Sequence, residues 1–474
     1  MLRGGSVMNK YKTLLSNTLL ISIGTFGSKI LVFFMVRFYT GYLTPSDYGT
    51  ADLITQTANL LFPIISLGIT DGVFRFALDN ERGRRSVFTV GFITITAGSV
   101  FFLAAVPLLN TVKEFKGYIW LIVIYTMASC YHSLCSQFIR ARGNTALFSV
   151  QGIINTALVI GLNVLFLAVM RIGVTGYVLS VVLADFLCTV FLVVKERLWT
   201  QLTLHPRKIA FKRMLRYSIP LIPATIFWWI TSVSDRYMVN AMIGSTENGI
   251  YAVSYKIPTI LTLVSTIFMQ AWQFSAVTES HGDKEEHIRF FSNVWRSFQA
   301  VMFLAGAVII AFAKPAIKLL STEQYYSAWQ YVPLLSASMI FTAFVSFTGT
   351  VYVVTKQSGI SFATAMVGAA VNIALNLLLI PSPLGVQGAA IATFLSYFAV
   401  FLIRAVNSRK YIPFKLYGGH VALNTAIILI QIVFSVLELP FWIPVQAVSL
   451  IALMAVNYKF ILVCLNKLLS MVKK

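Results

Sequence analysis

The chain has 474 residues, of which 58% are hydrophobic and only 11% charged, and its formal net charge is +21. A soluble domain of this size needs more charged surface, so the composition excludes soluble enzymes and binding modules and indicates a polytopic membrane protein. No aromatic-rich basic module is present, so the excess of Lys and Arg favours membrane topology over a nucleic-acid partner.

Fourteen apolar segments approach the roughly 20 residues that a helix needs to cross the bilayer core. They are apolar all round, which predicts helices and not the alternating strands of a barrel. The first is too long for a signal-peptide core, and either Met1 or Met8 serves as the start. The segments lie near 13–37, 47–70, 86–110, 117–139, 146–170, 174–195, 214–242, 247–277, 290–313, 328–355, 359–380, 386–406, 418–437 and 440–464.

The distribution of basic residues predicts the orientation. If the N-terminus is cytoplasmic, 27 of the 37 Lys and Arg residues fall on cytoplasmic segments and 5 on outside loops. Lys and Arg collect in cytoplasmic loops, so we expect a multi-pass protein of the plasma or inner membrane with both termini in the cytoplasm. The longest cytoplasmic connection, near 196–213, is basic. It is either a helix lying on the anionic inner leaflet or an ordinary positively charged loop.

An internal repeat divides the chain. Residues 24–76 and 218–276 each hold a long apolar segment, a turn that ends in acid-x-Gly, and a second apolar segment. Spans 1–6 therefore match spans 7–12, and because both halves start inside, the repeat is parallel and a substrate site is expected between the halves. The predicted parts are an N-terminal six-helix lobe (1–195), a basic cytoplasmic linker (196–213), a second six-helix lobe (214–406) and two additional helices (407–474).

Four basic residues inside predicted spans are candidates for substrate binding. A basic residue at the bilayer centre costs about 2.5–3.5 kcal/mol on insertion scales, so these side chains should face protein or a watery cavity. One interpretation is a cationic cleft for an anionic substrate, since an Arg side chain binds two phosphate oxygens at once. The other is snorkelling to the interface or pairing with an acid. The residues are Lys29, Arg37, Arg236 and Lys256.

Three intramembrane carboxylates, Asp52, Asp185 and Asp235, are candidates for ion coupling or for charge partners of a Lys or Arg. A carboxylate in a span can take up a proton or a cation, which suits ion-coupled transport. Asp52 is the better coupling candidate, whereas the neighbouring Arg236 favours a structural partnership for Asp235. Pro63 and Pro258 predict kinks in spans 2 and 8. We expect no metal site, cofactor or catalytic residues, because no ligand-spaced His or Cys motif occurs.

Several short motifs together resemble the Wzx-type polysaccharide and oligosaccharide flippases of the multidrug/oligosaccharidyl-lipid/polysaccharide (MOP) exporter superfamily. The resemblance covers nearly the whole chain. It is carried by the turn Leu43-Thr44-Pro45-Ser46-Asp47-Tyr48-Gly49, the end of span 2 from Gly68-Ile69 to Phe74-Arg75-Phe76, Glu247-Asn248-Gly249-Ile250-Tyr251, and Gly385-Val386-Gln387-Gly388-Ala389-Ala390.

The resemblance implies two six-helix lobes around a central cleft lined by spans 1, 2, 7 and 8. It further implies that an undecaprenyl-diphosphate-linked oligosaccharide moves from the inner to the outer leaflet by alternating access, with protons or sodium as coupling ions. The alternative is an ion-coupled small-molecule exporter of the MATE type, which would prefer an acidic cleft. A membrane glycosyltransferase or polymerase is disfavoured because the sequence has no large outside loop, and a structural scaffold would not need the cations.

Overall fold

The computed structural model describes residues 31–458 except 32, 80–82, 110–116, 279–283 and 356, together with residue 462. The described residues form helices joined by turns, and none of them lies in a strand, which confirms the predicted all-α fold. The chain divides into two compact units, Met1–Trp229 and Ile230–Lys474. We describe each unit by itself.

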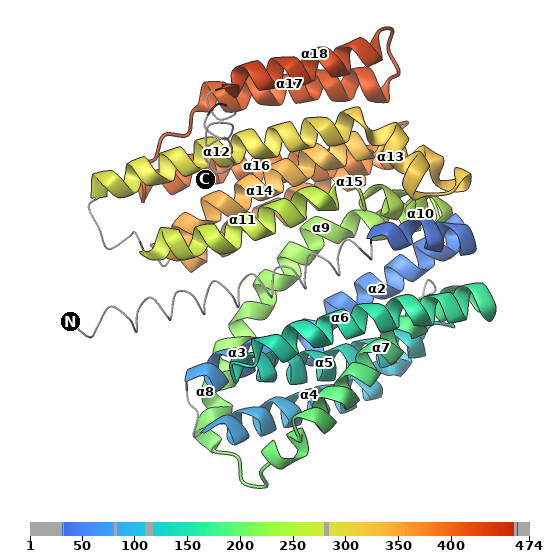
Figure 1. Cartoon of the computed structure of the whole chain (residues 1–474), viewed down its shortest axis with the longest axis vertical. Coiled ribbons are helices and arrows are strands. Elements are labelled where there is room, and N and C mark those ends of the chain that lie inside the picture. Colours follow the sequence, from blue (N-terminus) through green and yellow to red (C-terminus); the bar gives the residue numbers. More distant parts are fainter. Residues whose placement is uncertain are drawn as a thin grey trace, which may run out of the picture. The chain divides into compact units, whose positions relative to one another are not determined.

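The first unit is a bundle of long helices joined by short turns (Figure 1). After the turn at Thr44, the helices are α2 (Pro45–Ile65), α3 (Ile69–Asp79), α4 (Arg84–Leu109), α5 (Ile119–Ala141), α6 (Thr145–Asn163, continued by the π-helical Val164–Val169), α7 (Gly173–Lys195), α8 (Lys208–Ser218) and the first part of α9 (Ile222–Met242).

The second unit has the same character and ends in a helical hairpin, α17 and α18 (Figure 1). Beyond the remainder of α9, its helices are α10 (Ser245–Ser254), α11 (Thr259–Thr278), α12 (Lys284–Ala311), α13 (Ala313–Leu320), the 3-10 segment Glu323–Gln330, α14 (Val332–Val354), α15 (Ser358–Leu379), α16 (Val386–Asn407), α17 (Gly418–Val436) and α18 (Trp442–Val456).

Nine helices among the described residues are long and apolar enough to cross a membrane, or up to eleven if each of two bent pairs is one span. The protein is thus a multi-pass membrane protein. The seventh predicted span, near 214–242, was placed too early: Lys208–Ser218 forms the separate helix α8, and α9 begins at Ile222. Pro220 and Pro223 explain the interruption, because proline lacks an N–H and is tolerated only in the first turn of a helix.

Two spans are broken close to the two prolines that predicted kinks. The helix pair α2 and α3 bends by 55°, and the pair α10 and α11 bends by 46°. Pro63 lies in the last turn of α2, after which Leu67 and Gly68 adopt left-handed φ angles of 51° and 61°. Pro258 lies in the turn between α10 and α11. Both breaks follow the turn that marks each repeat, so the kink predictions are confirmed and the two halves share a local design.

The turn before α2 is built by its own side chains. Thr44 Oγ1 accepts the backbone N–H of Asp47 at 3.2 Å, and Asp47 Oδ2 accepts the backbone N–H of Thr44 at 3.4 Å. This capping box satisfies two backbone donors at the helix start, and Pro45 supplies a helical φ in the first turn. The Thr-Pro-Ser-Asp motif is therefore a helix start, which explains its position in the sequence.

In the first unit the helices approach closely through small residues. Helix α5 packs against α2, α3, α4 and α7. Where α4 crosses α2, a Cβ at Gly98 would lie 2.0 Å from the carbonyl oxygen of Ile65, so only glycine fits there. Close backbone approach of this kind drives helix association in lipid, where apolar burial between helices gains little.

The second unit is centred on aromatic rings. Helix α14 packs against α11, α12 and α16, and the fully buried Trp295 of α12 lies against Phe344, Phe347 and Phe401 with ring centroids 5.0, 5.1 and 6.0 Å away. The Trp295 indole N–H donates to the Leu416 carbonyl at 2.7 Å. Such ring pairs add dispersion and quadrupole energy that does not depend on water.

A lysine joins the C-terminal hairpin to the rest of the second unit. Lys314 Nζ lies 4.2 Å from the ring centroids of both Trp329 and Trp442, and it forms an ion pair with Glu438. Trp329 belongs to the segment before α14, whereas Glu438 and Trp442 belong to the hairpin. A cation between two aromatic faces is favourable when it is partly desolvated.

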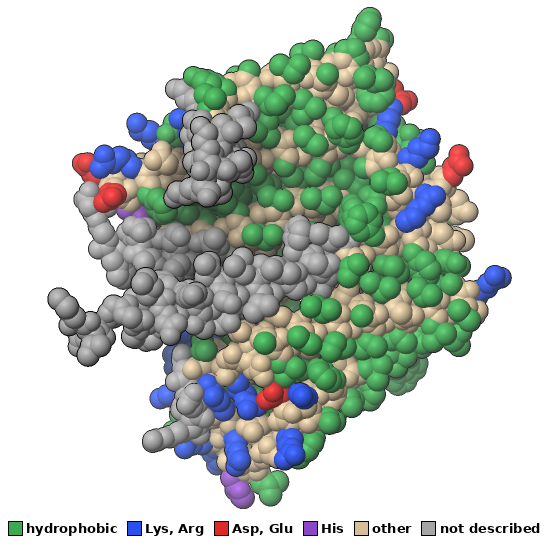
Figure 2. All heavy atoms as spheres, viewed as in Figure 1, with side chains coloured by type: hydrophobic (Ala, Val, Ile, Leu, Met, Phe, Trp, Pro, Cys, Tyr) green, Lys and Arg blue, Asp and Glu red, His purple; other side chains and the backbone are tan. Residues whose placement is uncertain are grey.

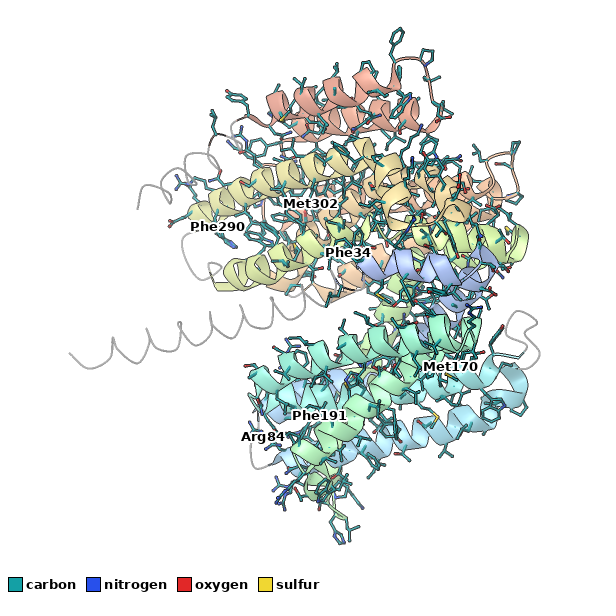
Figure 3. The ribbon with its side chains drawn as sticks, turned by 45° about the vertical axis from the view of Figure 1, so that its right-hand side comes forward. Phe34, Arg84, Met170, Phe191, Phe290 and Met302 are labelled. Carbon is teal, nitrogen blue, oxygen red and sulfur yellow. The ribbon has the colours of Figure 1, made fainter. Side chains whose placement is uncertain are left out.

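Charged residues lie at the helix ends. In the first unit, Arg84 at the start of α4 and Met170 after α6 lie at opposite ends of the bundle (Figure 3). Lys and Arg side chains gather at the end where α8 lies, and hydrophobic side chains cover the visible helix faces (Figure 2). The described first unit thus has one basic end.

Candidate functional site

The predicted site residues are divided between the units. Lys29 lies outside the described residues. Arg37 and Asp52 belong to the first unit, where the Arg37 side chain is exposed and Asp52 is buried, with Gln56 Nε2 donating to its carboxylate at 3.4 Å. Arg236 and Lys256 belong to the second unit. The described candidates of each unit are therefore considered with the residues of their own unit.

Asp235 of α9 is the fully buried carboxylate of the second unit, with 0% of its surface exposed. Its Oδ2 accepts hydroxyl hydrogen bonds from Tyr251 at 2.8 Å, Tyr255 at 2.6 Å and Thr393 at 3.0 Å. The two tyrosines stand four residues apart, so they share one face of the chain around α10. Three donors compensate a charge that would otherwise be costly to bury.

Arg236 shares a tyrosine with its neighbour in sequence. Its side chain is 8% exposed, and its guanidinium carbon lies 4.4 Å from the centroid of the Tyr255 ring. Tyr255 thus binds Asp235 through its hydroxyl and Arg236 through its ring face. Lys256 follows directly in the turn between α10 and α11 and is half-buried. This arrangement places one candidate cation, Arg236, beside the buried carboxylate of Asp235.

A chain of amides extends the Asp235 cluster into α15. Asn372 Nδ2 donates to Thr393 Oγ1 at 3.4 Å, and Asn376 Nδ2 donates to Asn372 Oδ1 at 2.9 Å. Ser234 Oγ donates to the same Asn372 oxygen at 2.9 Å. The sequence analysis missed these residues. The signal was present as two asparagines four residues apart in an apolar span, a spacing that puts both on one helix face.

Asp185 of α7 is, with Asp52, a buried carboxylate of the first unit, and 8% of its surface is exposed. Ser129 Oγ donates to Oδ2 at 2.6 Å, and Asn155 Nδ2 donates to Oδ1 at 2.9 Å. His132 Nδ1 lies 3.0 Å from Oδ1. Helices α5, α6 and α7 each supply part of the cluster, so the site depends on their packing.

His132 was not recognised from the sequence as a site residue. Its Nε2 lies 2.8 Å from Gln151 Oε1, so both ring nitrogens face an oxygen acceptor. Imidazole is the side chain that changes charge near neutral pH. The His132–Asp185 pair can therefore hold a proton between two ionisable groups inside the bundle. No sequence motif indicated this pair, because His132 and Asp185 are far apart in the sequence.

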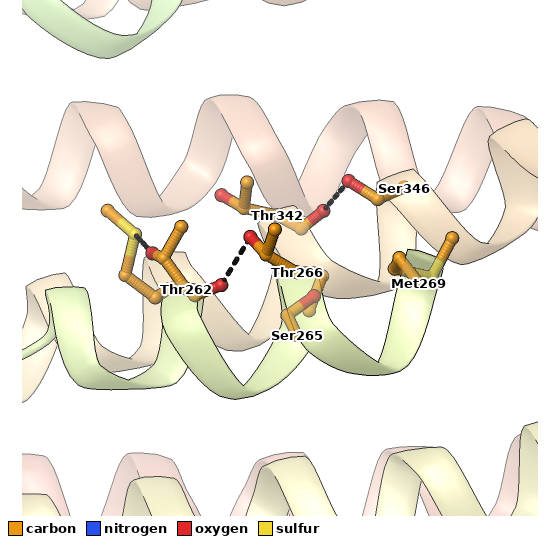
Figure 4. Close-up of a pocket in the computed structure, with 8 residues that line it drawn as sticks. Thr262, Ser265, Thr266, Met269, Thr342 and Ser346 are labelled. Atoms are coloured by element: carbon orange, nitrogen blue, oxygen red, sulfur yellow. Dashed lines mark hydrogen bonds between the residues drawn. The ribbon is translucent and has the colours of Figure 1, made fainter. Parts of the chain in front are cut away.

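A cavity lined with hydroxyl groups opens between α11 and α14 (Figure 4). Its volume is about 280 Å³, and none of its eight lining side chains is charged. Thr266, Thr342 and Ser346 donate to carbonyls of their own helices, so their oxygens remain acceptors toward the cavity. The lining residues are Thr262, Ser265, Thr266, Met269, Met339, Thr342, Ala343 and Ser346.

Ser265 stands out in this lining. Its surface is 7% exposed, and among the described residues its hydroxyl has no hydrogen-bond partner. The Ser265 hydroxyl and the acceptor oxygens of the lining together suit a neutral ligand rich in O–H groups.

This helical arrangement matches solved membrane transporters. The lipid II flippase MurJ in an inward closed conformation has a TM-score of 0.68 at 14% identity, covering 95% of this chain and 100% of that chain. An inward-facing multidrug resistance MATE family transporter of the MOP superfamily has a TM-score of 0.65 at 12% identity, covering 81% and 94%. The Vibrio cholerae MATE transporter VcmN has a TM-score of 0.59 at 12% identity, covering 84% and 96%. The protein has the fold of MOP superfamily transporters.

The sequence itself matches the model of a protein family. The sequence model of a family described as polysaccharide biosynthesis protein matches residues 35–330, more than half of the chain. The chain belongs to this family of polysaccharide biosynthesis proteins. The predicted resemblance to the MOP superfamily and its polysaccharide branch is thereby confirmed. No protein with a curated description matches the sequence.

Proposed function

We propose that the protein is a flippase that moves an undecaprenyl-diphosphate-linked oligosaccharide from the inner to the outer leaflet for cell-surface polysaccharide synthesis. Membership of a polysaccharide biosynthesis family with a transporter fold supports this proposal. The single observation that carries it is the uncharged, hydroxyl-lined cavity between α11 and α14. Sugars are neutral and rich in O–H donors, and that lining supplies the acceptors they need.

The cations would hold the anionic end of this substrate. Lys29, Arg37, Arg236 and Lys256 are the proposed diphosphate ligands, since Lys and Arg form charge-assisted hydrogen bonds to phosphate oxygens. In the second unit, Arg236 lies over the ring of Tyr255, and Lys256 is the residue that follows Tyr255 in the chain. This proximity to one tyrosine supports a joint role for the two cations. The prenyl chain would remain in lipid while the glycan passes through the protein.

Ion coupling by protons or sodium would use the buried carboxylates. Asp185 with His132, and Asp235 with Thr393 and the α15 amides, each provide several oxygen atoms within one helix bundle. Asp52, bonded to Gln56, is the third candidate. Uptake of an ion at such a site would change the charge inside the bundle, which can bias the two states of an alternating-access cycle.

The proposal includes the placement of the chain in the cell membrane. We place both termini in the cytoplasm, because the positive-inside rule then accounts for the distribution of Lys and Arg. We propose two six-helix lobes, 1–195 and 214–406, joined by the linker 196–213 and followed by two additional helices in 407–474. Such parallel repeats put the substrate between two halves that rock against each other.

Complementation in a strain that lacks its own flippase tests the function. Surface polymer and trapped lipid-linked intermediate would be measured for wild type, Lys256→Gln and the double variant Ser265→Val/Thr266→Val at matched membrane abundance. Each lost hydrogen bond to the substrate is worth about 1 kcal/mol, so we expect flipping to fall about fivefold for each side chain.

Thr425→Val is the matched control. Thr425 Oγ1 donates to a carbonyl of its own helix at 2.7 Å, as Thr266 Oγ1 does, but it lies on α17 outside the cavity. It should export normally. Normal export by the double variant would remove the cavity from the mechanism. Failure of wild type to restore polymer, together with efflux of organic cations, would replace the flippase with a MATE-type exporter.

A further inference from the structure

A second cavity, apolar and larger, lies within the first unit between α2, α4 and α8. Its volume is about 610 Å³, and its lining is apolar except for Thr94. Helix α4 contributes Gly98 and Phe101, and α8 contributes Phe211 and Leu215. A pocket of this size without charged lining suits a hydrocarbon chain rather than a polar metabolite.

The break between α2 and α3 creates this hollow. Helix α2 ends at Ile65, and α3 leaves at an angle of 55° after the left-handed Leu67 and Gly68. Helix α4 stays in contact with the end of α2 through Gly98. The end of α2, the turn residue Leu67 and helix α4 all line the cavity, so it lies where α2 and α3 diverge. Helix α8 lies beside α3 and α4 at this end of the unit (Figure 1).

Helix α8 presents cations next to the hollow. Met214 and Ser218 are buried and hold α8 on its neighbours, whereas Phe211 and Leu215 line the cavity. Lys212 and Arg216 each directly follow a lining residue, about 100° further round the helix. With Lys208 one turn earlier, they form a stripe at four-residue spacing on the adjoining face. We call Lys208, Lys212 and Arg216 the α8 stripe.

The α8 stripe has the properties of an anion-binding surface. All three side chains are exposed, and helix α8 contains no Asp or Glu. None of the three forms an ion pair within the part of the chain that the structure describes. Lys and Arg side chains gather visibly at this end of the unit, next to hydrophobic side chains (Figure 2). Anionic headgroups attract such basic helices at the membrane surface.

We infer that the first unit binds one anionic phospholipid, with an acyl chain in the α2–α4–α8 cavity and the headgroup phosphate on the α8 stripe. The cavity supplies the apolar contact, and the stripe supplies the charge complementarity. An undecaprenyl chain is several times longer than an acyl chain and does not match a hollow of about 610 Å³. This inference does not depend on the proposed function.

Lipid titration of the purified full chain tests the inference. Thermal unfolding and native mass spectrometry in detergent would compare phosphatidylglycerol with phosphatidylcholine. Each basic residue near the headgroup changes binding by about fivefold, so Lys208→Gln/Lys212→Gln/Arg216→Gln should weaken phosphatidylglycerol binding by about a hundredfold. Ala97→Trp, which puts an indole into the cavity lining, should reduce binding of both lipids.

The matched control is Lys195→Gln/Arg197→Gln/Arg213→Gln. It removes the same charge from exposed positions around the same connection, outside the stripe, and should bind phosphatidylglycerol as wild type does. Equal binding of the two lipids by wild type, or equal losses in both triple variants, would overturn the inference. Preferential binding of undecaprenyl phosphate at the same site would also overturn it. The stripe variant decides the matter even if Ala97→Trp fails to fold, because it changes only exposed side chains.

Discussion

Asp185 of the first unit and Asp235 of the second are both buried among apolar helices, yet different chemistry stabilises each of them. In the first unit, Asp185 faces His132, a second ionisable group, together with a serine and an asparagine. In the second unit, Asp235 is enclosed by three hydroxyl groups and lies beside an arginine held on a tyrosine ring. The first cluster pairs a carboxylate with an imidazole and can exchange a proton internally, whereas the carboxylate of the second accepts hydrogen bonds from hydroxyl groups.

This difference in partners assigns different roles to Asp185 and Asp235. The sequence favoured Asp52 for coupling and a structural partnership with Arg236 for Asp235, and it left the role of Asp185 open. The histidine partner makes Asp185 the candidate that responds to pH near neutrality. The hydroxyl cage makes Asp235 the candidate whose loss damages folding most, because its removal leaves several buried donors without an acceptor. Two variants, Asp235→Ala and His132→Gln, test this division, and a third, Gly98→Ala, tests a difference in helix packing between the units.

The largest effect is expected for Asp235→Ala. The hydroxyls of Tyr251, Tyr255 and Thr393 would lose their shared acceptor, and each unsatisfied donor costs about 1–3 kcal/mol. We expect the free energy of unfolding to fall by at least about 3 kcal/mol, measured by denaturation in detergent. Tyr255→Phe, which removes one donor and keeps the ring over Arg236, should cost about 1 kcal/mol. Unchanged stability of Asp235→Ala would show that the cage is not structural.

A smaller loss is expected for Gly98→Ala in the first unit. The added Cβ would lie 2.0 Å from the backbone oxygen of Ile65. That backbone cannot move away unless α2 separates from α4. We expect a cost of about 2–3 kcal/mol, at the upper end for overpacking. The control is Gly306→Ala in the second unit, where the new Cβ meets the Ile340 side chain at 2.4 Å. A side chain can rotate away, so equal losses in the two variants would refute this difference between the units.

The smallest change in stability, and the clearest change in pH response, is expected for His132→Gln. Glutamine keeps a hydrogen-bonding group near Asp185 but does not titrate, so stability should change by about 1 kcal/mol or less. Flipping by wild type in proteoliposomes should vary between about pH 5 and 8, and the variant should flatten that profile. A control, His287→Gln, removes a histidine of the second unit outside both clusters and should retain the wild-type profile. An unaltered profile for His132→Gln would exclude proton coupling at this pair.

Much of the fold followed from local sequence properties. Apolar length located the long helices, and proline located both broken spans, since each depends on residues near one another in the chain. The predicted start of α9 was wrong because the last five residues of α8, 214–218, run into the apolar segment 219–222 and extend the hydrophobic window. Pro220 and Pro223 indicate the boundary between α8 and α9 more reliably than the hydropathy of this segment does.

The candidate sites were less predictable because their partners come from distant segments. Asp185 could be chosen as an intramembrane charge, but its histidine lies on another helix with no motif between them. Tyr251 and Thr393 read as ordinary residues of apolar spans until α10 and α16 pack beside α9. The hydroxyl cavity likewise needs two helices, and serine and threonine in one helix alone bond to their own backbone.

The contact of Lys314 with the C-terminal hairpin has a consequence for biogenesis. A chain made on the ribosome emerges from its N-terminus, so Lys314 is synthesised well before Glu438 and Trp442. Until the hairpin emerges, that lysine has only one of its two aromatic neighbours, Trp329. Completion of the second unit therefore awaits the final pair of helices, and a nascent chain halted before α17 would be an incomplete intermediate open to quality control.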